Sequence, residues 1–414
     1  MVYLNKIIML YNSRYRLAEK IYLSLYITSL MLVGIFMMTT TNYSGELSSF
    51  EYLVSSSELT IILGYSVLGF IAAYFFYIIT KDKRIAFSFS PFRVNILRLN
   101  IVFGGLLIAQ LFFLVLTGVG RIGSQATNPF SPLFALLNID GLFTIFYMLV
   151  RKSPCGNRTL FWFTVTIYVI YKLLQGWSGV FLTIFFMELY FYFQSHTFKF
   201  WNRIFMVILL PLFILLIGGK IYHYVFPYKL EVRGMGMSQV SYSESVVNLT
   251  NRLTFFPVAV GAYEKDLEIQ HLAFQDGTFL REIKGFFRPF TPRFLMDDKD
   301  FRSINNLVMQ SFFPSIEGST SSDIGLIMYV YTLFKLNVGE TIVWLVFTFM
   351  LLLFNKAIID AFEQYKGQLN FIYFLLIMKL YYTASPEMVF GYGSISILFL
   401  LPLLFATGSI KFKR

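Results

Sequence analysis

The sequence predicts an all-α polytopic membrane protein with about 10–12 transmembrane helices and one large extramembrane loop. Hydrophobic residues make up 57% of the chain and the mean hydropathy is +0.64, both outside the range of soluble domains. Uncharged apolar runs such as 205–218 and 395–405 suit helices that cross a hydrocarbon core of about 30 Å. A β-barrel would instead show short segments of alternating hydropathy.

Ten apolar segments are each expected to form a helix: 20–40, 58–80, 99–119, 132–150, 159–175, 179–195, 203–219, 339–355, 368–384 and 393–409. They divide the chain into N-terminal helices (1–219), a large polar loop (220–322) and a C-terminal region (323–414). Residues 323–337 are apolar but short for a membrane crossing. We interpret them as a re-entrant or interfacial segment, with a short tilted span, and so eleven crossings, as the alternative.

The basic residues predict the orientation of these helices. Most Lys and Arg residues outside the large loop fall in the termini and in connections of one face: Lys6, Arg14, Arg16, Lys20, Lys81, Lys83, Arg84, Arg93, Arg98, Arg151, Lys152, Arg158, Lys199, Arg203, Lys356, Lys366, Lys411, Lys413 and Arg414. The short loops of the other face contain only Arg121. Because short basic loops stay in the cytoplasm, we expect both termini inside and the large loop outside.

The charge and the motifs exclude several classes of function. The large loop has eleven basic and eleven acidic residues, so the net charge of +11 reflects membrane topology, and no nucleic-acid partner is expected. Cys155 is the single cysteine, which excludes a disulfide or a thiolate metal site. No phosphate-binding or metalloprotease motif is present. The acidic run from Asp297 to Asp300 is interpreted as a solvated turn, so neither metal nor other cofactor is expected.

Candidate functional residues gather in the large loop. Arg281, Lys284, Arg288 and Arg293 alternate with phenylalanines, and Arg252 stands apart from other cations. Guanidinium groups bind phosphate through paired hydrogen bonds, although an amphipathic surface segment explains the Arg/Phe run equally well.

Three further residues are candidates. His223 and His271 are possible general bases. Asp266 and Glu268 lie near His271 in the sequence and are expected to orient its imidazole. The alternative is that the histidines are ordinary polar residues without a catalytic role. Asp140, inside a predicted helix, is either functional or a partner for a neighbouring hydroxyl or amide.

The layout resembles Wzy-type O-antigen or capsule repeat-unit polymerases of bacterial inner membranes, and the O-antigen ligases that share their architecture. The resemblance rests on the length, the aromatic-rich helices and one dominant loop in the second half with Arg and His residues. The stretch 175–179 is similar to a Gly/Ser turn that opens a helix in many members, without the Arg that many relatives carry there. The stretch 318–325 is similar to the small-residue segment that ends their loop.

The resemblance implies glycosyl transfer on the periplasmic face of the inner membrane, with no nucleotide sugar or metal. An oligosaccharide on undecaprenyl pyrophosphate would be the donor and a second lipid-linked repeat unit the acceptor. Cations would stabilise the leaving pyrophosphate, and a base would serve the acceptor hydroxyl. The expected cations are Arg252, Arg288, Arg121, Arg281 and Arg293; the expected bases are His271 and His223.

The expected partners are membrane lipids and a chain-length regulator protein. An O-antigen ligase and a flippase for the same lipid remain as alternatives. A lipid-phosphate-sugar glycosyltransferase also remains, since it would need an acidic residue in the first outer loop, where Glu46 and Glu51 lie.

Overall fold

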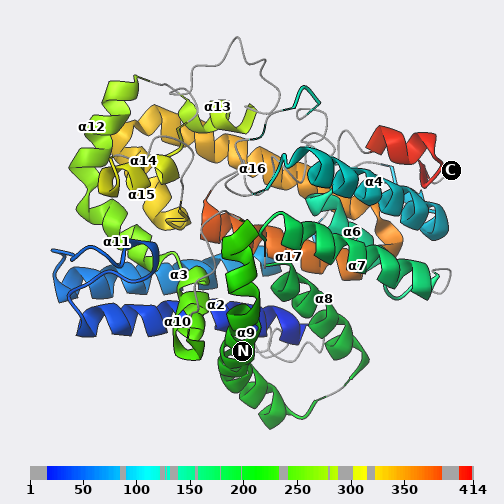
Figure 1. Ribbon diagram of the computed structural model, residues 1–414, viewed down its shortest axis with the longest axis horizontal. Helices are drawn as coiled ribbons and strands as arrows, with labels where there is room; N and C mark the ends of the chain where they lie inside the picture. The colour runs from blue at the N-terminus through cyan, green and yellow to red at the C-terminus, as the bar shows by residue number, and fades with distance from the viewer. Residues whose placement is uncertain are drawn as a thin grey trace.

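The described part of the chain is mostly α-helical, as the sequence predicts for this membrane protein (Figure 1). The computed structural model describes residues 16–83, 90–121, 126, 128–130, 139–153, 157–177, 179–196, 198–232, 241–277, 280–287, 302–314, 322–384 and 401–412. The predictions for Cys155, Arg288, Arg293 and Asp297 to Asp300 concern positions outside these residues.

The helices outside the large loop are α2 (Leu17–Thr39), α3 (Ser56–Thr80), α4 (Ile96–Thr117), α6 (Asp140–Val150), α7 (Arg158–Leu174), α8 (Val180–Ser195), α9 (Phe200–Val232), α15 (Leu326–Leu336), α16 (Val338–Ala361) and α17 (Lys366–Thr383). Most lie within a few residues of the predicted segments. Side-chain caps explain several starts. Ser55 and Glu58 form a capping box at α3, and Asn95 accepts from the Arg98 amide at α4.

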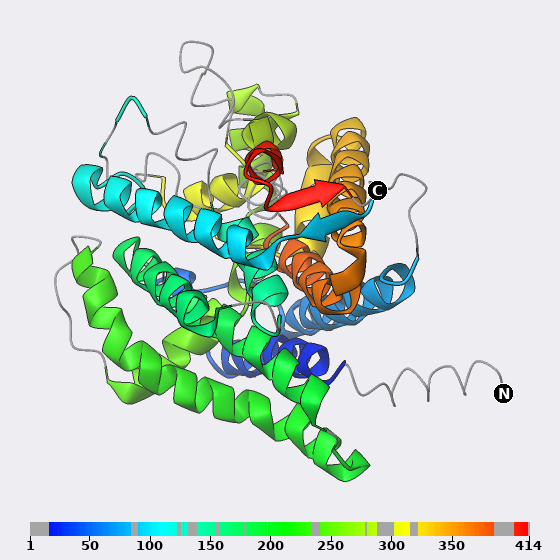
Figure 2. The ribbon, with the colours of Figure 1, turned by 90° about the vertical axis from the view of Figure 1, so that its right-hand side faces the viewer.

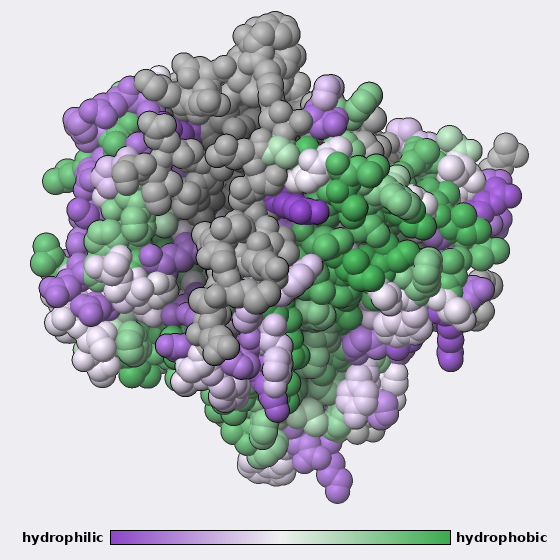
Figure 3. All heavy atoms as spheres, viewed as in Figure 1, coloured by the Kyte–Doolittle hydropathy of each residue, from purple (hydrophilic) through white to green (hydrophobic). Residues whose placement is uncertain are grey.

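Five of the described helices are long and apolar enough to cross a membrane: α2, α3, α4, the part of α9 from Phe200 to Tyr228, and α16. Their outward side chains are apolar. On α4, Ile101, Phe112 and Leu116 are exposed, and a broad hydrophobic surface covers this side of the molecule in Figure 3. An apolar exterior of this extent is stable in contact with lipid.

Helix α9 differs most from its predicted boundaries. The helix expected to end at residue 219 continues without a break through Lys220 to Val232, and α9 is therefore about 50 Å long (Figure 2).

Helix α15 has 11 residues and a length of about 16 Å, half of a bilayer core. It is joined to α16 by Asn337 and packs against it, with the Tyr329 and Trp344 rings 5.1 Å apart.

The large loop is itself helical. Its helices are α10 (Tyr242–Arg252), α11 (Phe256–Glu264), α12 (Asp266–Asp276), α13 (Arg281–Phe287) and α14 (Ile304–Phe312). Helices α12, α13 and α14 lie together with α15 toward one end of the molecule (Figure 1). Helices α10 and α11 are held to the connection after α2, which contains the short η2 turn (Gly45–Leu47). The Ser44 hydroxyl donates to Asn251 of α10 at 2.6 Å, and the Tyr43 hydroxyl donates to Glu264 of α11 at 3.0 Å.

Helix α10 packs closely along α9 at a pair of glycines. A Cβ atom on Gly219 would lie 2.4 Å from Cγ2 of Val246 and 3.1 Å from its Cα. A Cβ atom on Gly218 would lie 2.8 Å from a methyl group of Leu249. Only glycine allows the two backbones to approach this closely.

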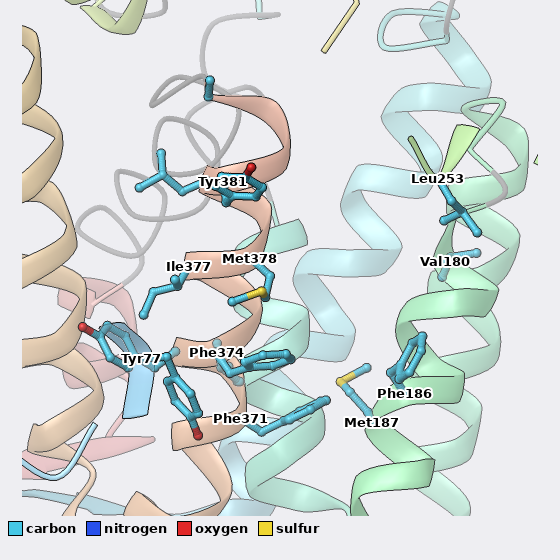
Figure 4. Close-up of a cluster of buried hydrophobic side chains, with 14 of the residues drawn as sticks. Tyr77, Val180, Phe186, Met187, Leu253, Phe371, Phe374, Ile377, Met378 and Tyr381 are labelled. Atoms are coloured by element: carbon cyan, nitrogen blue, oxygen red, sulfur yellow. The ribbon is translucent and has the colours of Figure 1, made fainter. Parts of the chain in front are cut away.

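Helix α17 packs against α3, α6, α15 and α16. Figure 4 shows Phe371 and Phe374 pointing from α17 toward α8, from which Met187 points back. The short η6 turn (Glu363–Tyr365) leads into α17. Strand β1 (Phe92–Val94) pairs antiparallel with β2 (Ile410–Phe412), which places the last described residues beside the connection between α3 and α4.

Replacing Gly219 with alanine should lower the melting temperature of the detergent-purified protein, because overpacking of this kind costs about 1 to 3 kcal/mol. Gly105→Ala is the matched control, since a Cβ atom there meets nothing within 4 Å. Adding Val246→Ala to the Gly219 variant removes the methyl group that clashes and should recover part of the loss. Equal melting of the Gly219 and Gly105 variants would contradict the described packing of α10.

Candidate functional site

Arg252 is the last residue of α10, and its side chain is exposed. Its Nε donates to the Tyr222 hydroxyl of α9 at 3.0 Å, and its carbonyl oxygen accepts from the Tyr382 hydroxyl of α17 at 2.9 Å. The two terminal guanidinium nitrogens have no hydrogen-bond partner among the described residues. The guanidinium is therefore fixed on one edge and open on the other, which suits a bidentate contact with a phosphate group.

Phe255, three residues further on, holds this turn against the bundle. Its ring packs at 5.6 Å from the ring of Tyr382 and at 5.8 Å from that of Phe70. The same ring occupies the space where Gly325 would carry a side chain, since a Cβ there would lie 2.4 Å from it. Gly325 also has φ +74°, a conformation that favours glycine. This contact brings the segment before α15 to the end of α10.

Asp323 lies in that segment, two residues before Gly325, and is half-buried. Charged groups near its carboxyl include Lys379 of α17 and Glu46 of η2, and Tyr382 lies near it as well. Burial raises the pKa of Asp323 to about 7, with Glu46 acting in the same direction and Lys379 opposing it. The described residues supply no hydrogen-bond donor to this carboxylate.

A column of aromatic rings extends from this point into the bundle. Tyr382 lies 5.5 Å from Tyr26, Tyr26 stacks on Tyr22 at 4.7 Å, and Tyr22 lies 4.8 Å from Phe186 of α8. Tyr22 and Tyr26 remain partly exposed. Phenol rings offer an apolar face and a polar edge, which are the surfaces that sugar rings and lipid chains contact.

Arg281 has a different role from the one the sequence suggested. The side chain is only 3% exposed, and its guanidinium donates to the Ala273 carbonyl at 2.9 Å and lies 3.8 Å from Asp276. Its backbone amide donates to Glu340 of α16 at 3.0 Å. Phe286 on the same helix packs against Phe347 of α16 at 5.1 Å. Arg281 thus braces α13 against α12 and α16.

The two histidines of the loop lie in different places. His271 is exposed on α12, and the carboxylates that the sequence suggested would orient it accept from other groups: Asp266 pairs with Lys335, and Glu268 with Lys265 at 3.0 Å. That expectation was wrong, because both carboxylates point toward lysines. His223 on α9 is half-buried, with Nδ1 3.5 Å from the Ser245 hydroxyl. The hydrogen bond from Arg252 is accepted by the neighbour of His223 in the sequence, Tyr222.

Asp140 at the start of α6 is the partner of a hydroxyl and of an ammonium group. It accepts from Tyr168 at 2.9 Å and from Lys172 at 2.7 Å, and Lys172 also donates to Gln175 at 2.8 Å. Lys172 is buried in this network. Arg121 is half-buried just past the end of α4, and its buried Nε has no hydrogen-bond partner among the described residues.

The site contains residues that the sequence argument passed over. Tyr222, Tyr382 and Asp323 are brought together by contacts between α9, α10, α17 and the chain before α15. In the sequence they are separated by more than fifty residues each, and tyrosine is too common here to stand out. The sequence contained one indication of this site, the small-residue stretch that ends at Gly325. Such a stretch indicates that the backbone lies close to another element.

Arg281→Ala and Arg252→Ala should differ in stability. Removing Arg281 leaves Asp276 buried with fewer partners and should cost on the order of 3 kcal/mol. Arg252 is exposed, and its removal should change stability by no more than about 0.5 kcal/mol. Melting temperatures of the two purified variants measure this difference. An Arg281 variant as stable as the wild type would contradict the bracing role.

The described residues contain no group of three or more His, Cys, Asp or Glu side chains arranged to hold a metal ion. Searches of protein-family models, of curated proteins and of solved structures found no match to this chain. The site is therefore interpreted from its own geometry: an exposed guanidinium, a half-buried carboxyl and a column of aromatic rings, all where the loop helices meet the membrane helices.

Proposed function

We propose that this chain is a membrane glycosyltransferase of the O-antigen polymerase type, which joins oligosaccharide repeat units carried on undecaprenyl pyrophosphate. The donor's sugar chain is transferred to a hydroxyl of a second lipid-linked unit, and polyprenyl pyrophosphate leaves. The reaction needs a place for a pyrophosphate beside lipid, a surface for sugars and a proton acceptor.

Arg252 is the observation that carries this proposal. Its guanidinium is oriented by Tyr222, its backbone is fixed by Tyr382, and its terminal nitrogens are open. Negative charge develops on the leaving pyrophosphate as its bond to the sugar breaks, and a fixed cation stabilises that charge without reorganising during the step. A fixed guanidinium where loop helices meet membrane helices suits a ligand with a charged headgroup and a lipid tail.

The aromatic column supports the same assignment. Tyr26 and Tyr22 continue from Tyr382 into the bundle and present partly exposed rings. A lipid-linked oligosaccharide requires apolar contacts for the prenyl chain and flat surfaces for the sugar rings. A flippase for the same lipid would not need a large folded domain of loop helices such as α10 to α14.

The proposal places ten to twelve crossings in a bacterial inner membrane, with both termini in the cytoplasm and the loop helices in the periplasm. The pairing of β1 with β2 supports one part of this topology. It puts the C-terminal segment beside the connection between α3 and α4, and both are among the basic segments expected on the cytoplasmic side.

Arg252→Ala should abolish the polymer ladder on lipopolysaccharide gels when supplied to a strain lacking this gene. Loss of one charge-stabilising group costs about 100-fold to 1,000-fold in rate, which is enough to stop chain growth beyond one repeat unit. A band of core plus a single unit should remain, because export and ligation do not need this protein. The amount of variant protein in the membrane, measured by immunoblot, must match that of the wild type.

Arg158→Ala is the control variant, since Arg158 is also exposed at the end of a helix but lies at the start of α7. It should restore the full ladder. A ladder restored equally by the Arg252 variant would remove this residue from the site. Complete loss of repeat units from the core in the deletion strain would instead identify a ligase or a flippase.

A further inference from the structure

Asp323 differs in its hydrogen bonding from five other acidic residues that are buried or half-buried. Asp140, Asp266, Asp276, Glu188 and Glu264 each accept a hydrogen bond from, or pair with, a described side chain or backbone amide. Asp323 has no hydrogen-bond donor among the described residues, although much protein surrounds it. A carboxylate placed this way keeps both oxygen atoms available to a ligand.

The groups that face Asp323 come from several elements. Helix α17 contributes Lys379 and Tyr382, η2 contributes Glu46, and α2 contributes Tyr26. Arg252 of α10 lies near the same Tyr382 hydroxyl. The Tyr382 hydroxyl donates to the backbone carbonyl of Arg252, and the charges of both Asp323 and Arg252 act on the Tyr382 phenol. A carboxylate and a guanidinium, the two charges that a glycosyl transfer to a hydroxyl requires, therefore lie around one tyrosine.

The position of Asp323 is fixed by packing. Gly325, two residues later, has φ +74° and lies directly against the Phe255 ring. Phe255 in turn contacts Tyr382 and Tyr381. Because Phe255 is three residues after Arg252, a single aromatic contact sets the relative position of the cation and the carboxylate.

We infer that Asp323 is the catalytic base of the proposed glycosyl transfer, an inference that rests on the function proposed above. The acceptor hydroxyl oxygen forms a bond to the anomeric carbon of the donor sugar while the bond from that carbon to the pyrophosphate oxygen breaks. The bonding electrons go to the pyrophosphate, whose charge faces Arg252. The hydroxyl proton passes to the Asp323 carboxylate, so the step is balanced without metal or redox partner.

The charge state of Asp323 suits this role. Burial and Glu46 raise its pKa to about 7, and a base works best when its pKa lies near the working pH. The group is a base only when deprotonated, so the rate should rise with pH through about 7 and then level off. His271 is exposed on α12, and His223 lies beside Ser245; neither is among the described residues whose charges act on Tyr382.

The test uses the full-length protein in phospholipid vesicles and lipid-linked repeat units extracted from the membranes of the deletion strain. Asp323→Asn should lower kcat by about 100-fold or more while changing KM by less than about threefold, since the amide keeps the shape but cannot take the proton. Asp323→Glu should keep part of the rate and the rise with pH. Arg252→Ala should raise KM as well as lower kcat.

The outcomes separate the inference from the function it depends on. Wild-type protein that extends the lipid-linked units, together with an Asp323→Asn variant of near-normal kcat, would overturn the base assignment and leave the polymerase standing. A wild-type rate that does not change between pH 6 and pH 8 would overturn it too, without any variant. Failure to extend chains both in wild-type vesicles and in native membranes that carry the gene would overturn both.

Discussion

The contact between the Phe255 ring and the backbone of Gly325 is the constraint on which the site depends. The ring fits because Gly325 has no side chain, and no other residue type would leave this space. It joins α10 and α11 to the segment before α15, and through Tyr381 and Tyr382 it joins both to α17. The loop helices are thereby held in one position relative to the membrane helices. Because Arg252 is the last residue of α10, its position is fixed as well.

Burial decides whether an arginine of the large loop stabilises the fold or stays available to a ligand. Arg281 and Arg252 both lie at the end of a loop helix, and the sequence made both of them candidates for binding pyrophosphate. The first is enclosed by α12 and α16, where it donates to a carbonyl group and lies 3.8 Å from Asp276. The second keeps its terminal nitrogens open because only a phenol and a backbone contact hold it. An enclosed cation stabilises the fold, whereas an open one can exchange water for an anion.

The class of the protein and most helix boundaries follow from hydropathy, because a lipid exterior requires apolar segments with caps or breaks at their ends. Arg252 was also found from the sequence, as an isolated cation before an apolar run. Asp323, Tyr222 and Tyr382 could not be found in this way, since their proximity arises from contacts between distant helices. The extension of α9 was missed because Lys220 looked like a helix end, although a lysine is fully compatible with a continuing helix.

The pairing of β1 with β2 has a consequence for biosynthesis. The strand Phe92–Val94 pairs with residues 410–412, which follow it by more than 300 positions. During synthesis the ribosome must therefore reach residue 412 before this sheet can close. Until then β1 has no strand partner, so the segment that leads into α4 is completed only after α17 has been made.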